Sequence, residues 1–261
     1  MSFAEKNGIR YFQFDSLRVR HAVFSRHGGV SAMPWDSLNV GGTVGDDIEH
    51  VRRNRVLSFQ ALGCKPESMF DVWQVHSTDV AYAESPHPKE FEYQKADIIL
   101  TDKPEVSLFM RFADCVPILV HDKVKQVVGV AHAGWMGTVK DVAGETVNAM
   151  RERYGSKPTD VVACIGPSIG PDHYEVGDDV IQQAKQLFGE DSGLVLDAHG
   201  EQIHFDLWKA NQLLLQRVGV EQIEIAGICT ACHTKDWFSH RAEKGKTGRF
   251  GALISLAARY I

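Results

Sequence analysis

Cysteine, long apolar runs and clustered positive charge are all scarce in this chain of 261 residues. The five cysteines are an odd number spread from Cys64 to Cys232, which favours reduced thiols in the cytoplasm over a disulfide framework. No stretch approaches the roughly 18 apolar residues of a membrane span, and residues 1–14 lack the apolar core of a signal peptide. We therefore expect a cytoplasmic protein that does not enter a membrane.

The charge balance argues against another class of partner. The formal net charge is -6, and the 28 lysines and arginines form no basic run. A protein that binds the phosphate backbone of nucleic acids needs such a run. We expect no nucleic-acid partner, although single nucleosides and small anions fit this composition. The sequence says little about assembly, and we expect a monomer or a small homo-oligomer.

The pattern of apolar residues predicts the fold class. With 44% hydrophobic residues the chain can bury a substantial core, and no repeat or linker divides it, so we predict a single domain over residues 1–261. Short apolar runs rich in β-branched residues predict strands at 19–25, 70–75, 98–101, 106–112, 116–121, 126–132, 161–165 and 222–228. These strands do not alternate strictly with helices. The prediction is therefore an α+β fold with a mixed, partly antiparallel β-sheet core and helices packed on its faces.

Helical periodicity adds four helices to this prediction. Apolar spacing or end signals place three of them at 46–62, 138–154 and 178–188. Asp46 and Glu49 have the spacing of a capping box at the start of the first helix. Gly189 is a stop signal for the third, and Asp206 can cap a fourth.

One metal-binding motif is incomplete. His173, followed much later by Cys229 and Cys232, is similar to the histidine and cysteine-pair signature of zinc deaminases. However, Ile228 stands where that signature has proline, and the intervening gap is long. Two reduced cysteines near a turn are the simpler interpretation of Cys229 and Cys232.

Three chemically reactive residues lie where apolar runs begin or end. His76 and His132 end two such runs, and Cys115 comes directly before a third. Each alone has an ordinary explanation, either a hydrogen-bonded boundary histidine or an inert buried cysteine. Together, one thiolate and two imidazoles are a ligand set suited to zinc or copper, and three protein ligands leave a fourth position for water or substrate. The separations along the chain are long, so only convergence in space can support this site.

At these residues the chain resembles the laccase-domain family, the YfiH-like proteins first described as polyphenol oxidases, a group that acts as purine nucleoside phosphorylases. The resemblance covers nearly the whole chain. It rests on segments 25–31 (SRHGGVS), 38–41 (LNVG), 51, 54–55, 74–76 (QVH), 113–115 (ADC), 131–135 (AHAGW), 166–167, 174–176 (YEV), 229–230, 238–239 and 247–249 (TGR). The chain departs from the family at His173, where a cysteine is expected, and at His240, where a tyrosine is commoner.

This resemblance implies a zinc ion held by His76, Cys115 and His132. It also implies phosphorolysis of adenosine, inosine, guanosine and methylthioadenosine, with adenosine deamination alongside and copper-linked phenol oxidation as a side activity. The expected classes are thus transferase (glycosyltransferase), hydrolase and oxidoreductase. Purine nucleosides and phosphate are the expected partners, and zinc, or copper, is the expected cofactor.

Phosphorolysis also requires groups that hold phosphate, and guanidinium groups match its oxygens in pairs. The candidates are Arg26, Arg55, Arg241 and Arg249. Arg26 and Arg249 are favoured among them because neighbouring glycines let backbone amides approach an anion as well.

Three further polar residues are candidates for the same site. Asp114, beside the thiolate, is a candidate general acid or a partner that orients a ligand, and a turn carboxylate is the alternative. His27 and Asn39 are candidate contacts for ribose or phosphate.

Two other functions stay open at this stage. In the first, Cys115 is the nucleophile of a cysteine hydrolase, with His132 or His76 as its base. In the second, zinc ties strands together in a non-catalytic partner-binding module, which a fourth protein ligand such as His233 or Cys232 would support.

Overall fold

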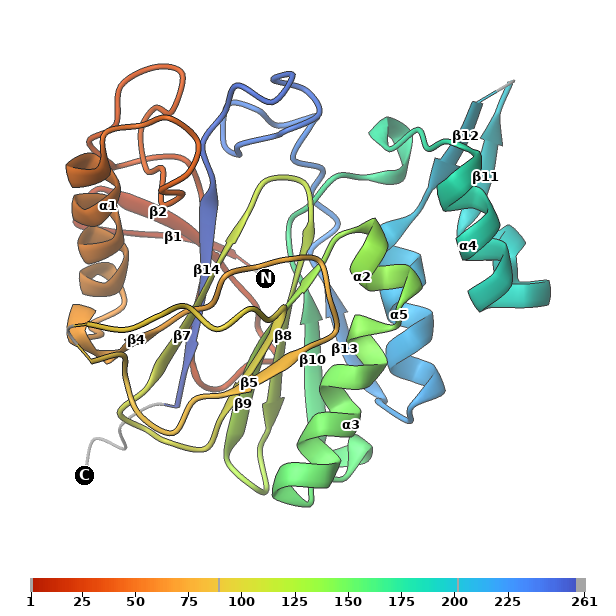
Figure 1. Ribbon diagram of the computed structural model, residues 1–261, viewed down its shortest axis with the longest axis horizontal. Helices are drawn as coiled ribbons and strands as arrows, with labels where there is room; N and C mark the ends of the chain where they lie inside the picture. Colours follow the sequence, from red (N-terminus) through yellow and green to blue (C-terminus); the bar gives the residue numbers. More distant parts are fainter. Residues whose placement is uncertain (1, 89, 201, 257–261) are drawn as a thin grey trace.

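The computed structural model of the protein describes residues 2–88, 90–200 and 202–256. Within these residues, two six-stranded sheets pack face to face and helices cover their outer sides (Figure 1). The first sheet has the order β1 (Ser2–Lys6), β2 (Ile9–Gln13), β3 (Arg20–Phe24), β14 (Phe250–Ser255), β7 (Ser107–Phe112), β4 (Met69–Phe70). The second has the order β13 (Gln222–Ile225), β10 (Val161–Ile165), β8 (Val116–Asp122), β9 (Val127–Ala133), β6 (Ile98–Thr101), β5 (Val80–Tyr82).

Both sheets mix strand directions. In the second sheet β8 pairs antiparallel with β9 and β10, whereas β5 and β6 are parallel, as are β10 and β13. In the first sheet β4 runs parallel to β7, and the remaining pairs are antiparallel. The predicted α+β class with a mixed sheet and helices on its faces is therefore confirmed, although the core consists of two large sheets.

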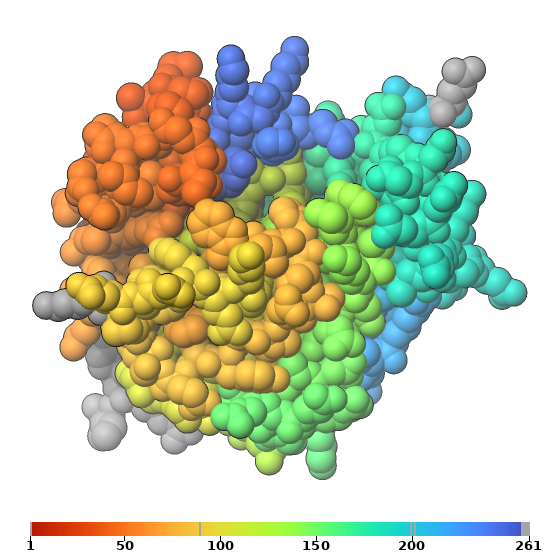
Figure 2. Space-filling view, in the orientation of Figure 1, coloured from red at the N-terminus to blue at the C-terminus, as the bar shows by residue number. Residues whose placement is uncertain are grey.

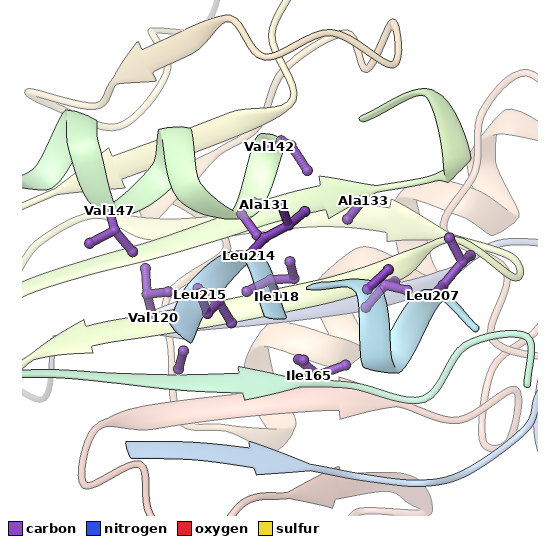
Figure 3. Close-up of a cluster of buried hydrophobic side chains, with 14 of the residues drawn as sticks. Ile118, Val120, Ala131, Ala133, Val142, Val147, Ile165, Leu207, Leu214 and Leu215 are labelled. Carbon is purple, nitrogen blue, oxygen red and sulfur yellow. The ribbon is translucent and has the colours of Figure 1, made fainter. Parts of the chain in front are cut away.

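Apolar clusters hold four layers together. Helix α1 (Ile48–Ala61) packs on the outer face of the first sheet. Between the sheets, Val128 and Val130 of β9 meet apolar residues of β7 and β14. On the far side of the second sheet, helices α3 (Val142–Tyr154) and α5 (Leu207–Arg217) press apolar side chains onto β8, β9 and β10 (Figure 3).

Strands β8 and β9 have a protein layer on each face, and this explains their sequence. All seven residues of each strand are buried, so both strands are nearly continuous apolar runs without polar alternation. The short turn between them makes an antiparallel hairpin in which Val116 lies opposite Ala133. This register brings together the two ends of the hairpin that carry reactive side chains.

The helix predictions are correct in position and wrong in two details. Helix α4 (Asp178–Phe188) has the predicted bounds and ends at Gly189, and Asp206 caps α5 by accepting from the Lys209 backbone N–H at 2.9 Å. The helix predicted at 138–154 is two helices, α2 (Trp135–Val139) and α3, because Asp141 has φ 63° and interrupts the helical backbone.

The N-cap of α1 also differs from the predicted one. Asp47, not Asp46, accepts from the Glu49 backbone N–H at 2.9 Å. Asp46 instead accepts hydrogen bonds from Ser31 and Asn39 in the loop that precedes the helix. The capping-box prediction is therefore wrong by one residue.

The strand predictions miss part of the first sheet. The run at 70–75 is a strand only as far as Phe70, and residues 71–79 cross the molecule as an irregular segment. Strand β14 is central in the first sheet and was not predicted; its Gly251 breaks the apolar pattern, since a Cβ there would lie 2.5 Å from the Phe109 ring. The strands β11 (Leu196–His199) and β12 (Gln202–Phe205) form a separate hairpin. None of the described helices has the length and apolar character needed to cross a membrane.

Candidate metal centre and active-site cleft

The β8–β9 hairpin places Cys115 and His132 side by side. Pro117 of β8 pairs with His132 of β9, so Cys115, two residues earlier, lies across from Gly134. His132 has the same parity along β9 as Val128 and Val130, and its side chain therefore points toward the first sheet, where its ring lies 5.5 Å from that of Phe112. Residues 17 positions apart in sequence thus meet because antiparallel pairing folds one strand onto the next.

Gly134 lets the third residue approach. A Cβ at this position would lie 2.9 Å from Cys115 Sγ, closer than real Cβ atoms come to other atoms, and 3.1 Å from His76 Cδ2, closer than in most real contacts. The small residues after His132 are therefore needed because His76 and Cys115 occupy the space that a side chain would fill.

Asp97 positions both histidines. It directly precedes β6, which pairs with β9, and its Oδ1 lies 2.7 Å from His132 Nδ1. Its Oδ2 accepts from the backbone N–H groups of Val75 and Ser77 at 3.0 and 2.7 Å, which flank His76. His76 itself has φ 59°, an uncommon backbone conformation for a residue other than glycine, and these hydrogen bonds hold the chain on either side of it.

The three side chains fit a metal ion. One ligand atom from each of His76, Cys115 and His132 lies within 4.8 Å of the others. The hydrogen bond from His132 Nδ1–H to Asp97 fixes the tautomer in which Nε2 keeps its lone pair for a ligand, the arrangement common for metal-bound histidines. Two imidazoles and a thiolate suit zinc or copper, and no fourth side-chain donor from the described residues joins this group.

The electrostatics of the cluster favour a thiolate. Burial alone would raise the pKa of Cys115, but the charge of His132 and hydrogen bonds from His132 and His76 lower it to about 6. Burial likewise opposes a positive charge on His132, but the Cys115 thiolate and the Asp97 carboxylate raise its pKa to about 9. The thiolate is the form of cysteine that binds metals.

Asp114 ties three loops together next to this cluster. Its Oδ1 accepts from Thr230 Oγ1 at 2.7 Å and its Oδ2 accepts from the Arg241 backbone N–H at 2.6 Å. Its own carbonyl accepts from the Ile169 N–H at 2.9 Å, and its φ is 79°. With both carboxylate oxygens bonded to the protein, Asp114 is arranged to position its neighbours more than to exchange a proton.

A cleft of about 730 Å³ opens beside the three ligands. Figure 2 shows a hollow on this face, bordered by the blue C-terminal loop and by orange segments of the first half of the chain. The cleft is lined by five arginines: Arg52, Arg55, Arg111, Arg241 and Arg249. Three aromatic residues also line it: Trp73, Tyr93 and Tyr174. Cationic and aromatic side chains thus surround one small-molecule-sized space.

Among the predicted phosphate ligands that line the cleft, Arg249 is held in place by the buried Asn39. Its backbone N–H donates to Asn39 Oδ1 at 2.8 Å, and its guanidinium donates to the carbonyl of Gly248 at 2.8 Å. A Cβ at Gly41 would lie 2.6 Å from its Cγ, so the glycine leaves room for the side chain. Asn39 itself is fully buried and does not line the cleft, so its position supports a role in holding Arg249 and not the predicted contact with ribose or phosphate.

Arg55 and Arg111 form a second cationic wall around a buried carboxylate. Arg111 Nη1 lies 2.6 Å from Asp71 Oδ2, and Arg55 Nη1 lies 3.7 Å from the same oxygen. One carboxylate therefore serves two guanidinium groups, and the remaining positive charge faces the cleft. Burial is the largest influence on Asp71, but His87, Arg111 and Arg55 lower its pKa below the ordinary value.

Arg26 and His27 lie outside the cleft, in contrast to their prediction as phosphate or ribose contacts. The Arg26 guanidinium donates to the carbonyl of Asp36 at 2.8 Å, forms an ion pair with Glu243 at 3.1 Å and stacks on Phe238. His27 Nε2 lies 3.0 Å from Asp236 Oδ1. Both side chains thus have partners within the protein, and they line a separate pocket of about 330 Å³ away from the metal-ligand set.

Several residues of the site were not singled out from the sequence. Asp97 was missed although it is a lone carboxylate directly before an apolar run, a position comparable to that of Cys115. Arg111 lies inside an apolar run, and a charged residue within a predicted strand is a signal that could have identified it. Trp73 and Tyr93 gave none, because aromatic residues are equally common in cores, and Tyr174 stood only within a segment that carries the family resemblance.

The fold and the cluster together define a class: a two-sheet α+β protein with a metal-ligand set at the base of an arginine-rich cleft. Residues 20–257 match the family described as multi-copper polyphenol oxidoreductase laccase, and the chain belongs to this family. The family resemblance predicted from the sequence is thereby confirmed.

Similar proteins carry a different description of activity. The purine nucleoside phosphorylase of Deinococcus radiodurans is 36% identical over 253 residues, which are 97% of this chain and 95% of that protein. The purine nucleoside phosphorylase YlmD of Bacillus subtilis is 36% identical over 240 residues, 89% of this chain and 86% of that protein. The crystal structure of the Bacillus licheniformis hypothetical protein YfiH superposes with a TM-score of 0.91 at 33% identity, covering 98% of this chain and 99% of that one.

Proposed function

We propose that this protein is a zinc-dependent purine nucleoside phosphorylase that accepts adenosine, inosine, guanosine and methylthioadenosine. The observation that carries the proposal is the lining of the cleft, where five arginines surround the space beside His76, Cys115 and His132. Guanidinium groups bind phosphate oxygens in pairs, and the names of the relatives support the same reaction.

Phosphorolysis exchanges one bond for another at the ribose. An oxygen of phosphate attacks C1′, the bond from C1′ to the purine nitrogen breaks, and its electron pair leaves with the base. The proton of the hydrogen phosphate dianion ends on the base, so ribose 1-phosphate and free purine balance the reaction. In this proposal Arg249, Arg55 and Arg111 hold phosphate, and binding both reactants in one cleft lowers the entropic part of the barrier.

The purine is held by the aromatic side of the cleft. Trp73 and Tyr93 are both partly exposed at its edge, with ring centroids 6.5 Å apart, and Tyr174 lies deeper. Base–aromatic stacking tolerates different purines, because each presents a flat π face. This explains in physical terms why adenosine, inosine and guanosine can share one site.

Zinc would be held by His76, Cys115 and His132, and when bound it supplies a Lewis acid for charge that develops on the reacting groups. Asp97 keeps His132 in its ligating tautomer and fixes the backbone on both sides of His76. Asp114, whose two oxygens are already bonded, is proposed as a positioning residue for the loops that carry Thr230 and Arg241.

The proposal includes adenosine deamination as a second reaction in the same cleft. Deamination replaces the 6-amino group of the purine with oxygen from water and releases ammonia. A space of about 730 Å³ is larger than a nucleoside needs and leaves room for water next to the ligand set.

The test is incubation of the zinc-loaded protein with adenosine, with and without phosphate, followed by identification of the products. We expect adenine and ribose 1-phosphate only when phosphate is present, and inosine from deamination with or without phosphate. Adenine released at the same rate without phosphate would show hydrolysis and would overturn phosphorolysis. Copper-loaded protein with a phenolic substrate serves as the comparison for the oxidase activity that the family description suggests.

A cysteine hydrolase is the second candidate, and one observation favours it. The pKa of Cys115, lowered to about 6 by its two histidine neighbours, is what a nucleophilic cysteine needs. The two functions differ in their metal requirement. A hydrolase of this kind keeps its activity after chelation and loses it to iodoacetamide, whereas the phosphorylase loses activity to the chelator and regains it with zinc.

A further inference from the structure

A second group of soft ligand atoms lies outside the cleft. His173, Cys229 and Cys232 each place one ligand atom within 4.8 Å of the other two. The sequence favoured two unremarkable reduced cysteines here, but it could not show that His173 comes from another loop to meet them. From this convergence we propose that His173, Cys229 and Cys232 bind a second zinc ion, independently of the reaction in the cleft.

The spacing of the ligand atoms agrees with tetrahedral zinc. Bond lengths of about 2.3 Å to sulfur and 2.0 Å to nitrogen at tetrahedral angles place sulfur and nitrogen about 3.5 Å apart. His173 Nδ1 lies 3.4 Å from Cys232 Sγ and 3.9 Å from Cys229 Sγ, one on each side of that value. Shifts of a few tenths of an ångström would therefore bring both nitrogen–sulfur separations to the tetrahedral value.

The backbone around the cluster is already organised. Thr230 donates its N–H to the carbonyl of Ser168 at 2.9 Å, and Ser168 donates to Ile228 at 3.1 Å, so the two loops run side by side. Cys229 and Cys232 are three residues apart in a turn, the cysteine spacing common in zinc sites.

The buried sulfur of the pair has a donor aimed at it. Cys229 Sγ accepts from the Gly170 N–H at 3.2 Å, an interaction that stabilises a thiolate. A Cβ at Gly170 would lie 3.0 Å from Cys229 Cβ, so the glycine allows this close approach. Cys232 and His173 are exposed, which gives an ion a path from solvent and leaves its fourth position to water.

A bound ion would fasten together two loops that lie next to the cleft. The first loop carries Tyr174, which lines the cleft, directly after His173. The second carries Thr230, which donates to Asp114 beside Cys115. The proposed role of the second zinc is therefore structural, and its ligands do not take part in the reaction.

Zinc content is the primary test. The reduced full-length protein is stripped with a chelator, reloaded with Zn²⁺ alone, and freed of unbound metal before the bound zinc is measured. We expect two equivalents in the wild type and in Cys64→Ala, a control cysteine that belongs to neither cluster. We expect one equivalent in Cys232→Ser, because the first cluster keeps its own ion. Equal zinc content in the wild type and in Cys232→Ser would overturn the proposal.

Cobalt gives a second readout that does not depend on counting metal. Thiolate-to-cobalt absorption grows with the number of thiolate ligands, and the two clusters together have three, Cys115, Cys229 and Cys232. Cys232→Ser should therefore lose about two thirds of this absorption. His173→Cys should retain two metal equivalents and gain absorption, because it exchanges an imidazole for a thiolate, whereas His173→Ala should bind one. Equal spectra for His173→Cys and the wild type would show that residue 173 is not a ligand.

Discussion

The cluster of His76, Cys115 and His132 and the cluster of His173, Cys229 and Cys232 contain the same kinds of ligand atom in different surroundings. His132 is 4% exposed and donates to a buried carboxylate, whereas His173 and Cys232 lie at the surface. The first group lies at the base of an arginine-lined cleft, and the residues of the second do not line it.

This difference separates two uses of a metal-ligand set. A catalytic site needs a vacant position that faces a space for reactants, together with charges that bind them. The first cluster has both in the cleft and its arginines. The second has an exposed edge and two loops that run side by side, which suits an ion that holds the backbone in place.

The largest expected effect comes from removing a ligand of the first cluster. His132→Ala should lose its zinc and lower kcat/KM for adenosine phosphorolysis by about 10³-fold, because the several kcal/mol of charge stabilisation that a metal supplies are lost at 1.36 kcal/mol per tenfold. Cys115→Ala should behave alike. Both variants should keep the far-UV circular dichroism of the wild type.

The second cluster provides the contrast for this experiment. Cys232→Ser should retain the zinc of the first cluster, while His132→Ala should retain that of the second. If His132→Ala and Cys115→Ala keep full zinc and full activity, the assignment of the catalytic cluster is wrong.

The next largest effect is expected from the arginines of the cleft, which lie beside the first cluster only. Arg249→Ala should raise KM for phosphate by about 10- to 100-fold while the zinc content stays the same, because a charged hydrogen bond contributes about 1.5–3 kcal/mol. Steady-state rates at varied phosphate measure this. An unaltered dependence on phosphate would remove Arg249 from the binding site.

Arg26 provides a comparison for Arg249, because the sequence favoured both residues as phosphate ligands. Its ion pair with Glu243 and its hydrogen bond to Asp36 are internal, so Arg26→Ala should lower the free energy of unfolding by about 3 kcal/mol. Urea unfolding measures this loss. A raised phosphate KM with unchanged stability would return Arg26 to the list of phosphate ligands.

A smaller effect is expected for Asp97, the carboxylate that is hydrogen-bonded to His132 in the first cluster. Asp97→Asn should weaken zinc binding by about 10- to 100-fold, the usual cost of losing the hydrogen-bond partner of a ligating histidine. Competition with a chromophoric chelator measures the dissociation constant. Asp79→Asn, which changes an exposed carboxylate of the segment that carries His76, is the matched control and should bind zinc as the wild type does.

The last prediction uses pH on the metal-free protein. The pKa of Cys115 is lowered to about 6, so its thiolate persists above that pH and alkylation should slow as the pH falls through 6. Burial raises the pKa of Cys164 to about 12, so this thiol should stay unmodified between pH 5 and 9. Mass spectrometry after timed iodoacetamide treatment measures both. A Cys115 midpoint near the ordinary thiol value of about 8.5 would contradict the charge pair with His132.

The residues of this site that could be predicted are those whose signal lies in their immediate sequence neighbours. His76, Cys115 and His132 were found because each interrupts an apolar run, a feature that is visible in a few neighbouring residues. Arg26 was favoured as a phosphate ligand because of its neighbouring glycines, which are also a signal from adjacent residues. In the structure its guanidinium instead bonds to Asp36 and Glu243. Local pattern identified unusual residues but could not say what each of them faces.

The amino-acid sequence by itself determined the buried strands β8 and β9, the stop of α4, the start of α5 and the chemical types available for a metal, because apolar runs, caps and side-chain donors are properties of short segments. Only the tertiary structure decided which histidine meets which cysteine, that Asp97 joins His76 to His132, and that His173 reaches Cys229. These contacts join strands and loops that are distant in the chain, and their partners are selected by sheet register and layer packing, which no short stretch of sequence contains.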